Sequence, residues 1–468
     1  MNPTDPVRAF LDDHEQDLLD ELRDWVRIPS VSSEPEREMD VLRSANWLVG
    51  RLRDIGFPVV ERWGTEGGPA VYACWDVDPD APTVLVYSHH DVRAVRAATW
   101  GESAPFEPQG RDGRVYGRGT SDAKGQVLVH LWGLRAHLAA SGGTPAVNLR
   151  LLVEGEEEVG SPHLAALLTD RREQVSADLV VLSDTMLWTL DAPAICTGVR
   201  GMVSAHLEVR GPQRDVHSGA VAGAAPNPCM ELCRLLAQLH DDKGRVTLPG
   251  FYDAVEEISP QEREALAALP YSDEDWLART ETSTVGGEHG YTALERVWVR
   301  PSAEVLTLIG GDPIGASRGA VPSIAQADLS IRTAPAQKVA EVADQLRQWV
   351  AERISDKVHY ELTVSEESGQ EPYRTPDDTP ALTALDAAMA RGFGAAEVGR
   401  MRNGGGAPAS LLAETIGAPV IFFGTGLPED HWHDSDEKVE VEALLKGAAT
   451  MGHFWPELAE VHRGRDEG

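Results

Sequence analysis

The sequence predicts an α/β protein in which a mixed, mostly parallel sheet is sandwiched by helices and a smaller α+β domain is inserted. Short apolar runs alternate with segments of helical periodicity, as in strands joined by crossover helices. Between residues 199 and 375 the strands instead alternate apolar and polar residues, which is typical of an antiparallel sheet with one wet face. We therefore expect a catalytic domain of residues 1–198 and 376–468, with residues 199–375 as an inserted lid or dimerisation domain.

The expected elements alternate between helix and strand along the chain. Apolar residues at helical spacing predict helices over residues 7–27, 40–54, 124–140 and 162–175. Continuous apolar runs predict the strands of the main sheet over residues 69–76, 83–88, 147–153, 178–183 and 418–424. In the insert, RGMVSAHLEVRGP and SIAQADLSIRTAP alternate as strands do, whereas residues 228–240 and QKVAEVADQLRQWVAERI have helical spacing.

Composition excludes several classes of partner. The chain has 468 residues, 42% of them hydrophobic, and a net charge of −33, which disfavours binding to nucleic acids or anionic membranes. No apolar run approaches the roughly 20 residues of a membrane span, and the N-terminus lacks the pattern of a signal peptide. Four cysteines are too few for a disulfide framework at this length. We therefore expect a cytoplasmic protein with no nucleic-acid or membrane partner.

Acidic residues and histidines follow the expected strands. In an open α/β sheet, ligands gather at the carboxyl ends of the strands, so these side chains are expected to converge. Taken singly, each has an ordinary explanation as a helix cap, a solvated loop or a hydrogen-bonded surface histidine. Their coincidence at four strand ends and one glycine-rich loop predicts a metal site. The groups are His89–Asp91, Glu156–Glu158, Asp184, the stretch HWHDSDE after residue 430, and Asp122 in GRVYGRGTSDAKG.

The ligand types indicate which metals suit this site. Oxygen and nitrogen ligands without thiolates favour zinc, and also manganese or cobalt. Many carboxylates with few histidines favour two cations that share a bridging carboxylate, typically about 3.5–4 Å apart. A two-metal phosphatase would use similar ligands, but the sequence contains no loop that would cradle a phosphate.

The motifs YSHHDV, YGRGTSDAKG, EGEEEVGS, LSDT and HWHDSDE, in this order, resemble the dinuclear zinc metallopeptidases and amidohydrolases. That family includes carnosinase-type dipeptidases, aminoacylase, carboxypeptidase G and succinyl-diaminopimelate desuccinylase. The chain is most similar to the dipeptidase branch, over about residues 15 to 455. The resemblance implies hydrolysis of a peptide or N-acyl amide bond next to a free carboxylate, by a water molecule that two divalent cations activate.

The resemblance also implies a role for each site residue. Glu157 is expected to act as general base, Asp91 to orient a metal-binding histidine, and the peptide bond between Asp122 and Ala123 to be cis. From the insert, His217 is expected to reach into the active site of the partner subunit of a homodimer and Arg332 to hold the substrate carboxylate. The implied metal ligands are His89, Asp122, Glu158, Asp184 and His433.

The chain departs from the dipeptidase pattern at three positions. It reads RNGGGAP where the dipeptidases read REGGSIP, so Asn403 replaces an acid and Gly406 a serine, and Leu306 stands where an asparagine is usual. Loss of polar contacts to a substrate is costly, so we expect a substrate with a bulkier or less polar acyl side. A non-dipeptide N-acyl amino acid amidohydrolase and a metal-binding protein without turnover remain alternatives, although the presence of Glu157 and Asp122 argues against the second.

Overall fold

A six-stranded sheet with strand order β1-β2-β6-β3-β7-β17 forms the centre of the catalytic part of the protein. The computed structural model describes residues 5–64, 67–311 and 318–466. The pairs formed by β6, β3, β7 and β17 are parallel, and β1 and β2 add antiparallel strands at one edge. The strands are β1 (Val59–Trp63), β2 (Ala70–Trp75), β3 (Thr83–His89), β6 (Asn148–Glu154), β7 (Leu179–Leu182) and β17 (Val420–Phe422).

Helices cover both faces of this sheet, which confirms the predicted α/β class. Apart from the exposed edge strand β1, the strands are mostly apolar runs because successive side chains point to opposite faces and both faces are buried. In β3, Val84 and Val86 belong to one hydrophobic cluster, and Leu85 and Tyr87 belong to the other. The first cluster is covered by α1 (Pro6–Asp13), α2 (Glu15–Val26), α3 (Glu38–Ile55), α4 (Lys124–Ser141), α13 (Pro380–Phe393) and α15 (Val441–Asp466). The second is covered by α5 (Leu164–Asp170), α6 (Arg172–Val175) and α14 (Ala409–Ile416).

Two expected helices are each divided into two. The helix expected over residues 7–27 breaks at His14, whose ring nitrogen Nδ1 lies 2.8 Å from the carbonyl oxygen of Phe10. The helix expected over residues 162–175 breaks at Arg171, whose backbone leaves the helical region with φ −109° and ψ 20°. Apolar spacing continued across both breaks, so periodicity alone predicted single helices.

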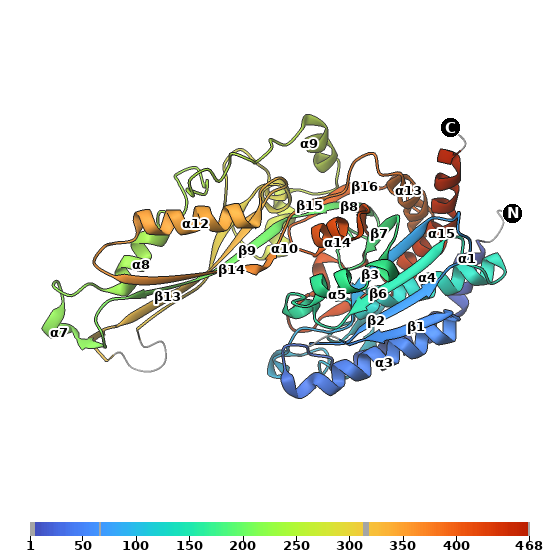
Figure 1. Ribbon diagram of the computed structural model, residues 1–468, viewed down its shortest axis with the longest axis horizontal. Coiled ribbons are helices and arrows are strands. Elements are labelled where there is room, and N and C mark those ends of the chain that lie inside the picture. Colours follow the sequence, from blue (N-terminus) through green and yellow to red (C-terminus); the bar gives the residue numbers. More distant parts are fainter. Residues whose placement is uncertain (1–4, 65–66, 312–317, 467–468) are drawn as a thin grey trace.

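A second, elongated part projects from the catalytic part (Figure 1). Its four-stranded antiparallel sheet has the order β11-β13-β9-β14, and α8 and α12 pack on one face to form a separate hydrophobic cluster. We call the residues of this sheet and its helices the lid. Its elements are β9 (Gly201–Arg210), β10 (Val216–His217), α7 (Ser218–Val221), α8 (Pro228–Leu236), β11 (Ser302–Gly310), β12 (Ala320–Val321), β13 (Ile324–Thr333), α12 (Val339–Arg353) and β14 (His359–Gln370).

A small three-stranded sheet, β15-β8-β16, lies where the chain enters and leaves the lid. The segment from residue 258 to residue 299 also packs there, because Ile258, Leu266 and Trp298 join the second cluster of the catalytic part. None of the helices in the described ranges combines the length and apolar character needed to cross a membrane. The remaining elements are β4 (Gln109–Arg111), β5 (Arg114–Tyr116), β8 (Ala194–Val199), α9 (Pro260–Ala267), α10 (Asp273–Thr280), α11 (Ala293–Trp298), β15 (Tyr373–Arg374), β16 (Gly399–Asn403) and β18 (Lys438–Glu440), with short 3₁₀ turns η1 (Pro35–Arg37), η2 (Ala97–Thr99), η3 (Glu157–Val159) and η4 (Pro428–Asp430).

Candidate metal centre and active site

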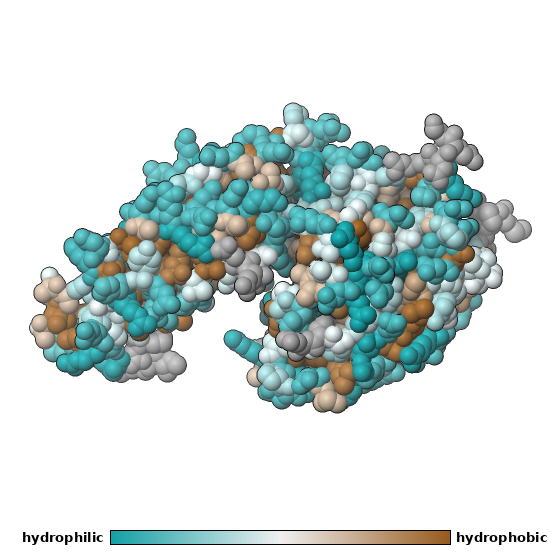
Figure 2. Space-filling view, viewed as in Figure 1, coloured by the Kyte–Doolittle hydropathy of each residue, from teal (hydrophilic) through white to brown (hydrophobic). Residues whose placement is uncertain are grey.

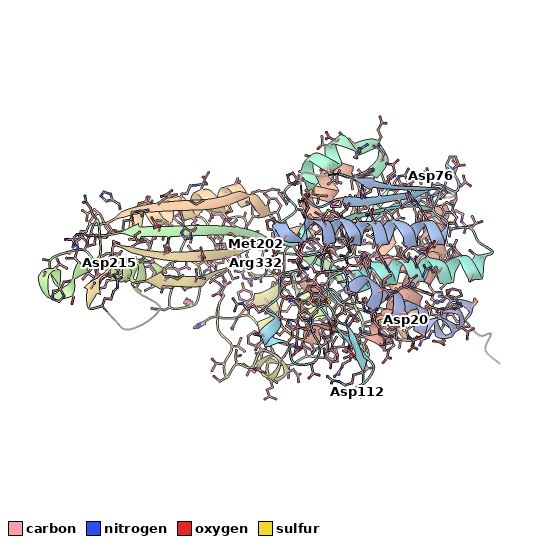
Figure 3. The ribbon with its side chains drawn as sticks, turned by 90° about the horizontal axis from the view of Figure 1, so that it is seen from below. Asp20, Asp76, Asp112, Met202, Asp215 and Arg332 are labelled. Atoms are coloured by element: carbon pink, nitrogen blue, oxygen red, sulfur yellow. The ribbon has the colours of Figure 1, made fainter. Side chains whose placement is uncertain are left out.

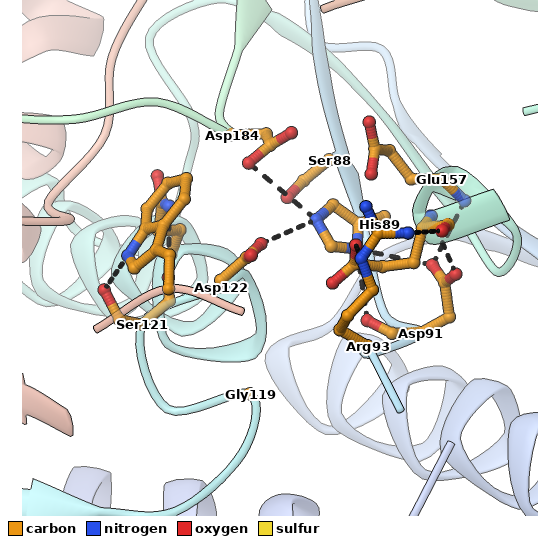
Figure 4. Close-up of polar contacts among 12 residues, drawn as sticks. Ser88, His89, Asp91, Arg93, Gly119, Ser121, Asp122, Glu157 and Asp184 are labelled. Carbon is orange, nitrogen blue, oxygen red and sulfur yellow. Dashed lines mark hydrogen bonds and ion pairs between the residues drawn. The ribbon is translucent and has the colours of Figure 1, made fainter. Parts of the chain in front are cut away.

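The carboxyl ends of three neighbouring strands bring the candidate site together. β3 ends at His89, β6 leads into the turn η3 that carries Glu157 and Glu158, and Asp184 follows β7. These strands pair in parallel, so their ends lie at one edge of the sheet. Figure 4 shows Asp122 and Asp184 both pointing toward the ring of His89.

Asp122 belongs to two groups of potential metal ligands. One group is His89, Asp122 and Asp184, and the other is Asp122, Glu158 and His433; within each, the ligand atoms lie within 4.8 Å of one another. Oδ1 of Asp122 is 3.2 Å from Nε2 of His89, and its Oδ2 is 3.0 Å from Nε2 of His433. The structure therefore assembles all five side chains that the sequence predicted as ligands, with one carboxylate between the two groups.

The donor set fits divalent cations. Two imidazoles and three carboxylates supply only nitrogen and oxygen donors, as zinc, manganese and cobalt sites do. The buried Nε2 of His89, although 3.2 Å from Oδ1 of Asp122, and the buried Oε1 of Glu158 make no hydrogen bond of regular geometry in the part of the chain that is described. Buried polar atoms are normally paired, so these two atoms point to a missing ligand.

The carboxylates hold protons on both imidazoles. Asp122 and Glu158 raise the pKa of His433 to about 10. Burial alone lowers the pKa of His89, but the carboxylates of Asp122, Asp184 and Asp91 raise it well above its ordinary value. Burial likewise opposes ionisation of Asp122, yet the two histidines lower its pKa. A cation that binds here replaces these protons, because metals bind neutral imidazole and ionised carboxylate.

Asp91 connects the first histidine to the turn that follows β6. Its Oδ1 lies 3.3 Å from Nδ1 of His89, and the side chain is fully buried. It also accepts hydrogen bonds from the backbone N–H groups of Glu157, at 3.3 Å, and Glu158, at 3.1 Å. One carboxylate therefore orients the His89 ring and fixes the loop that carries the two glutamates.

Glu157 lies beside the ligand groups but belongs to neither. Its side chain lines the cleft together with Asp122, Glu158 and Asp184. Burial, followed by repulsion from Asp184, raises its pKa well above the ordinary value for a glutamate. A carboxyl group of raised pKa at the wall of a cleft is suited to accept and return a proton.

Glu437 and Arg118 hold the backbone of the loop that carries Asp122, and neither was among the predicted site residues. The fully buried Glu437 carboxylate accepts hydrogen bonds from the backbone N–H groups of Gly119, Ser121 and Asp122 at 3.0–3.1 Å. Arg118 forms an ion pair with it at 2.6 Å. Arg118 lies in the motif YGRGTSDAKG and Glu437 in the motif HWHDSDE. The only sequence signal for their pairing was therefore one basic and one acidic residue in two loops that were expected to converge. The expected cis peptide between Asp122 and Ala123 is present.

A cleft of about 780 Å³ lies between the catalytic part and the lid, and it is lined by Arg332 and by every ligand side chain except His89. The space-filling view shows the molecule hollowed between these two parts (Figure 2). Arg332 is near the end of β13, beside Met202 of β9, and Figure 3 places both where the lid meets the catalytic part. Among the described residues, the Arg332 guanidinium forms no ion pair, and burial lowers its pKa. The structure therefore places Arg332 at the cleft, and its contact with a substrate carboxylate stays a prediction.

His217 does not approach the ligand groups of its own chain. It is exposed in β10, directly before α7, and α7 lies at the far end of the lid in Figure 1. Asp215, two residues earlier, is likewise at the far tip in Figure 3. Leu306 lies on the edge strand β11 of the lid and is 66% exposed to solvent.

Gln370 fills the space that Gly406 leaves open. A Cβ atom on Gly406 would lie 1.8 Å from Oε1 of Gln370, so a serine here would require the glutamine to move. Both residues line the cleft, together with Asn403, whose Oδ1 accepts a hydrogen bond from the Gly405 N–H at 2.9 Å. Gln370 was not among the predicted site residues, because no local signal in the sequence predicts that the end of a lid strand faces residue 406.

The chain was compared with known proteins. The model of peptidase family M20/M25/M40 matches residues 85–457. A cysteinylglycine-S-conjugate dipeptidase of Corynebacterium striatum is 28% identical over 444 residues, covering 93% of this chain and 94% of the relative. Human carnosine dipeptidase 1 has a TM-score of 0.80 at 26% identity, covering 97% of this chain and 99% of that structure. The metallo-carboxypeptidase Sso-CP2 from Sulfolobus solfataricus has a TM-score of 0.84 at 26% identity, covering 95% and 99%.

A helix-covered α/β sheet whose strand ends gather carboxylates and imidazoles defines the class of α/β metallohydrolases. The chain belongs to peptidase family M20/M25/M40, whose model matches most of its length. The protein is accordingly a metal-dependent hydrolase of peptide bonds, and the predicted resemblance to the dipeptidase branch is confirmed. A metal-binding protein without turnover and an N-acyl amino acid amidohydrolase are correspondingly disfavoured.

Proposed function

We propose that the protein is a dipeptidase that uses two zinc ions to hydrolyse the peptide bond next to a free carboxylate. The observation that supports this most directly is the position of Asp122 between two ligand groups, with His89 on one side and His433 on the other. When bound, two divalent cations supply Lewis acidity that polarises a carbonyl and lowers the pKa of water. Manganese and cobalt suit the same ligands.

In this proposal each site residue has one task. His89, Asp122 and Asp184 hold one cation, and Asp122, Glu158 and His433 hold the other. Asp91 keeps the His89 ring and the backbone of η3 in place. Glu157 takes a proton from the attacking water and returns it to the nitrogen of the leaving amine.

The substrate is proposed to be a small peptide. Arg332 faces the cleft with a half-buried guanidinium that pairs with no described carboxylate, so a substrate carboxylate would complete its charge pairing. The relatives named above that act on dipeptides support the same substrate class.

Metal removal tests this function. Dialysis against a chelator is expected to lower the hydrolysis of a responsive dipeptide by about 10²-fold or more, and added zinc, manganese or cobalt is expected to restore it. The assay would include Ala-Gly, carnosine, an N-acyl amino acid and a phosphate ester. Chelator-resistant hydrolysis, or turnover of the phosphate ester alone, would contradict the proposal. Rapid turnover of Ala-Gly or carnosine would refute only the expected bulky acyl side.

We further propose that the protein is a cytoplasmic homodimer and that residues 199–375 form its lid and dimerisation domain. The edge strand β11 exposes a row of apolar side chains, and such an edge favours pairing with another chain. Unpaired cysteines, Cys74, Cys196, Cys229 and Cys233, support a reducing compartment. The exposed apolar residues are Val305, Leu306, Leu308 and Ile309.

A mixing experiment tests whether His217 acts in the partner's site. His217→Ala and Glu157→Gln homodimers are each expected to be nearly inactive. After subunit exchange, a mixed dimer has one site with an intact Glu157 that receives the intact His217 of the other chain, so about a quarter of wild-type activity is expected to return. Sedimentation would verify that dimers form. If exchanged dimers gain no activity, His217 does not act across the interface.

A further inference from the structure

A second pocket of about 360 Å³ opens from the cleft on the side of Arg332. The two cavities share four wall residues, Met186, Arg332, Asn403 and Gly405. The second pocket is lined neither by Glu157 nor by any of the five ligand side chains. It is therefore an annex to the cleft that lies away from the ligand groups.

Three tryptophans from distant parts of the sequence line this annex. Trp188 and Trp298 are almost fully buried, and their rings meet edge to face with centroids 5.3 Å apart. Trp276 comes from α10, which is held in place because Arg279 forms an ion pair with Glu429 of η4 at 3.0 Å. The Arg279 guanidinium also stacks over Trp188, 5.1 Å from its ring centroid. These contacts hold the aromatic wall in place, and Arg279 itself also lines the annex.

Two guanidinium groups stand at the entrance to the annex. Arg200 donates hydrogen bonds to the carbonyl oxygens of Gly404, at 3.1 Å, and Arg300, at 3.2 Å. Neither Arg200 nor Arg332 forms an ion pair with a carboxylate of the described residues. Burial and the Arg332 charge lower the pKa of Arg200 to about 9. Arg200 is buried and Arg332 is half-buried, and Glu304 only partly offsets the charge of Arg200. Two guanidinium groups without an ion-pair partner favour an anion where the cleft and the annex meet.

We infer that the annex binds the side chain of the substrate's carboxyl-terminal residue and that the enzyme prefers a bulky apolar or aromatic residue there. This inference rests on the proposed dipeptidase function. In an amino acid the side chain branches from the carbon next to the carboxylate, so a carboxylate at Arg332 places the side chain beside that arginine. The annex is the cavity that shares Arg332 and leads away from the ligand groups.

The size and lining of the annex match this occupant. A cavity of about 150 Å³ is enough to hold benzene, so 360 Å³ accommodates a phenyl or indole ring. Aromatic rings pack edge to face or in offset stacks, and three indoles offer both kinds of surface. The annex therefore adds space on the carboxyl-terminal side of the substrate, whereas the sequence departures had suggested the acyl side.

Kinetics on Ala-Gly, Ala-Leu, Ala-Phe and Ala-Trp test the inference. The wild-type enzyme, loaded with zinc, is expected to favour Ala-Phe over Ala-Gly in kcat/KM by about 10-fold or more. Trp276→Ala, which removes one wall, and Val297→Trp, which fills the annex, are each expected to reduce this ratio by about 10-fold, mainly through KM. Trp75→Ala, in β2 on the far side of the main sheet, is the matched control and is expected to keep the wild-type ratio.

A second measurement covers the case in which turnover is low. Calorimetric titration with free phenylalanine and glycine is expected to show tighter binding of phenylalanine to the wild type, and a smaller difference in both annex variants. An unchanged Ala-Phe to Ala-Gly ratio in Trp276→Ala and Val297→Trp, in folded protein, would overturn the inference while leaving the dipeptidase function intact. If none of the dipeptides were hydrolysed, the proposed function would be rejected. The calorimetric comparison of phenylalanine with glycine would then still test whether the annex binds a bulky side chain.

Discussion

Replacing Asp122 by asparagine is expected to abolish metal-dependent activity, with a loss on the order of 10³-fold or more in kcat/KM. Among the described residues, Asp122 is the single carboxylate within 3.2 Å of both His89 and His433, so the variant removes the negative charge from both ligand groups at once. An asparagine cannot offer two anionic oxygens to two cations. We therefore expect metal analysis after dialysis to show fewer than two zinc ions per chain and activity near background.

The control for Asp122→Asn is Asp20→Asn. Asp20 is an exposed aspartate paired with Arg23 on the surface of α2, far along the chain from the site. Its substitution is expected to leave the metal content and kcat/KM at the wild-type level. If Asp122→Asn retained two zinc ions and full activity, Asp122 would not bridge the two ligand groups.

Glu157→Gln is expected to lower kcat by about 10²–10⁴-fold while both metals stay bound. Glu157 belongs to neither ligand group, so removing its charge leaves the five ligand side chains in place. A glutamine fills the same volume but cannot take a proton from water. We expect single-turnover kinetics to show a slowed chemical step, and metal analysis to give the wild-type stoichiometry.

Two controls make the Glu157 experiment specific. Glu173→Gln changes an exposed glutamate on α6 and is expected to have wild-type kinetics. Glu158→Gln alters a ligand instead of the base, so it is expected to lose metal as well as activity. The assignment of Glu157 as proton carrier fails if its substitution depletes metal as Glu158→Gln does, or if kcat is unchanged.

The catalytic core could be predicted largely from local patterns. The strands of the main sheet other than the exposed edge strand β1 are buried on both faces, and such strands must be short, continuous apolar runs, which are visible in the sequence. The strand β1, VVERW, carries no such run and was not predicted. Parallel strands place their carboxyl ends at one edge, so His89, Glu158 and Asp184 could be expected to meet before any coordinates were known. The motifs also predicted the peptidase family correctly.

The breaks in the helices expected over residues 7–27 and 162–175 could not be predicted in the same way. Apolar spacing reports which residues face the core, and it continues unchanged across His14 and Arg171. What ends each helix is a local backbone change, stabilised at His14 by a contact to the Phe10 carbonyl. The spacing of apolar residues therefore does not show where each helix ends.

The amino-acid order settles the chemistry of this protein, because metal ligands and a general base are particular residue types that occur at strand ends, and strand ends are marked by local hydrophobic patterning. Three-dimensional packing decides which residues line the cleft and the annex. Gln370 meets Gly406, and Trp188, Trp276 and Trp298 meet beside Arg332, only after the chain has folded back on itself. Contacts between segments so far apart in sequence depend on how the lid and the catalytic part pack, and no local periodicity encodes that arrangement.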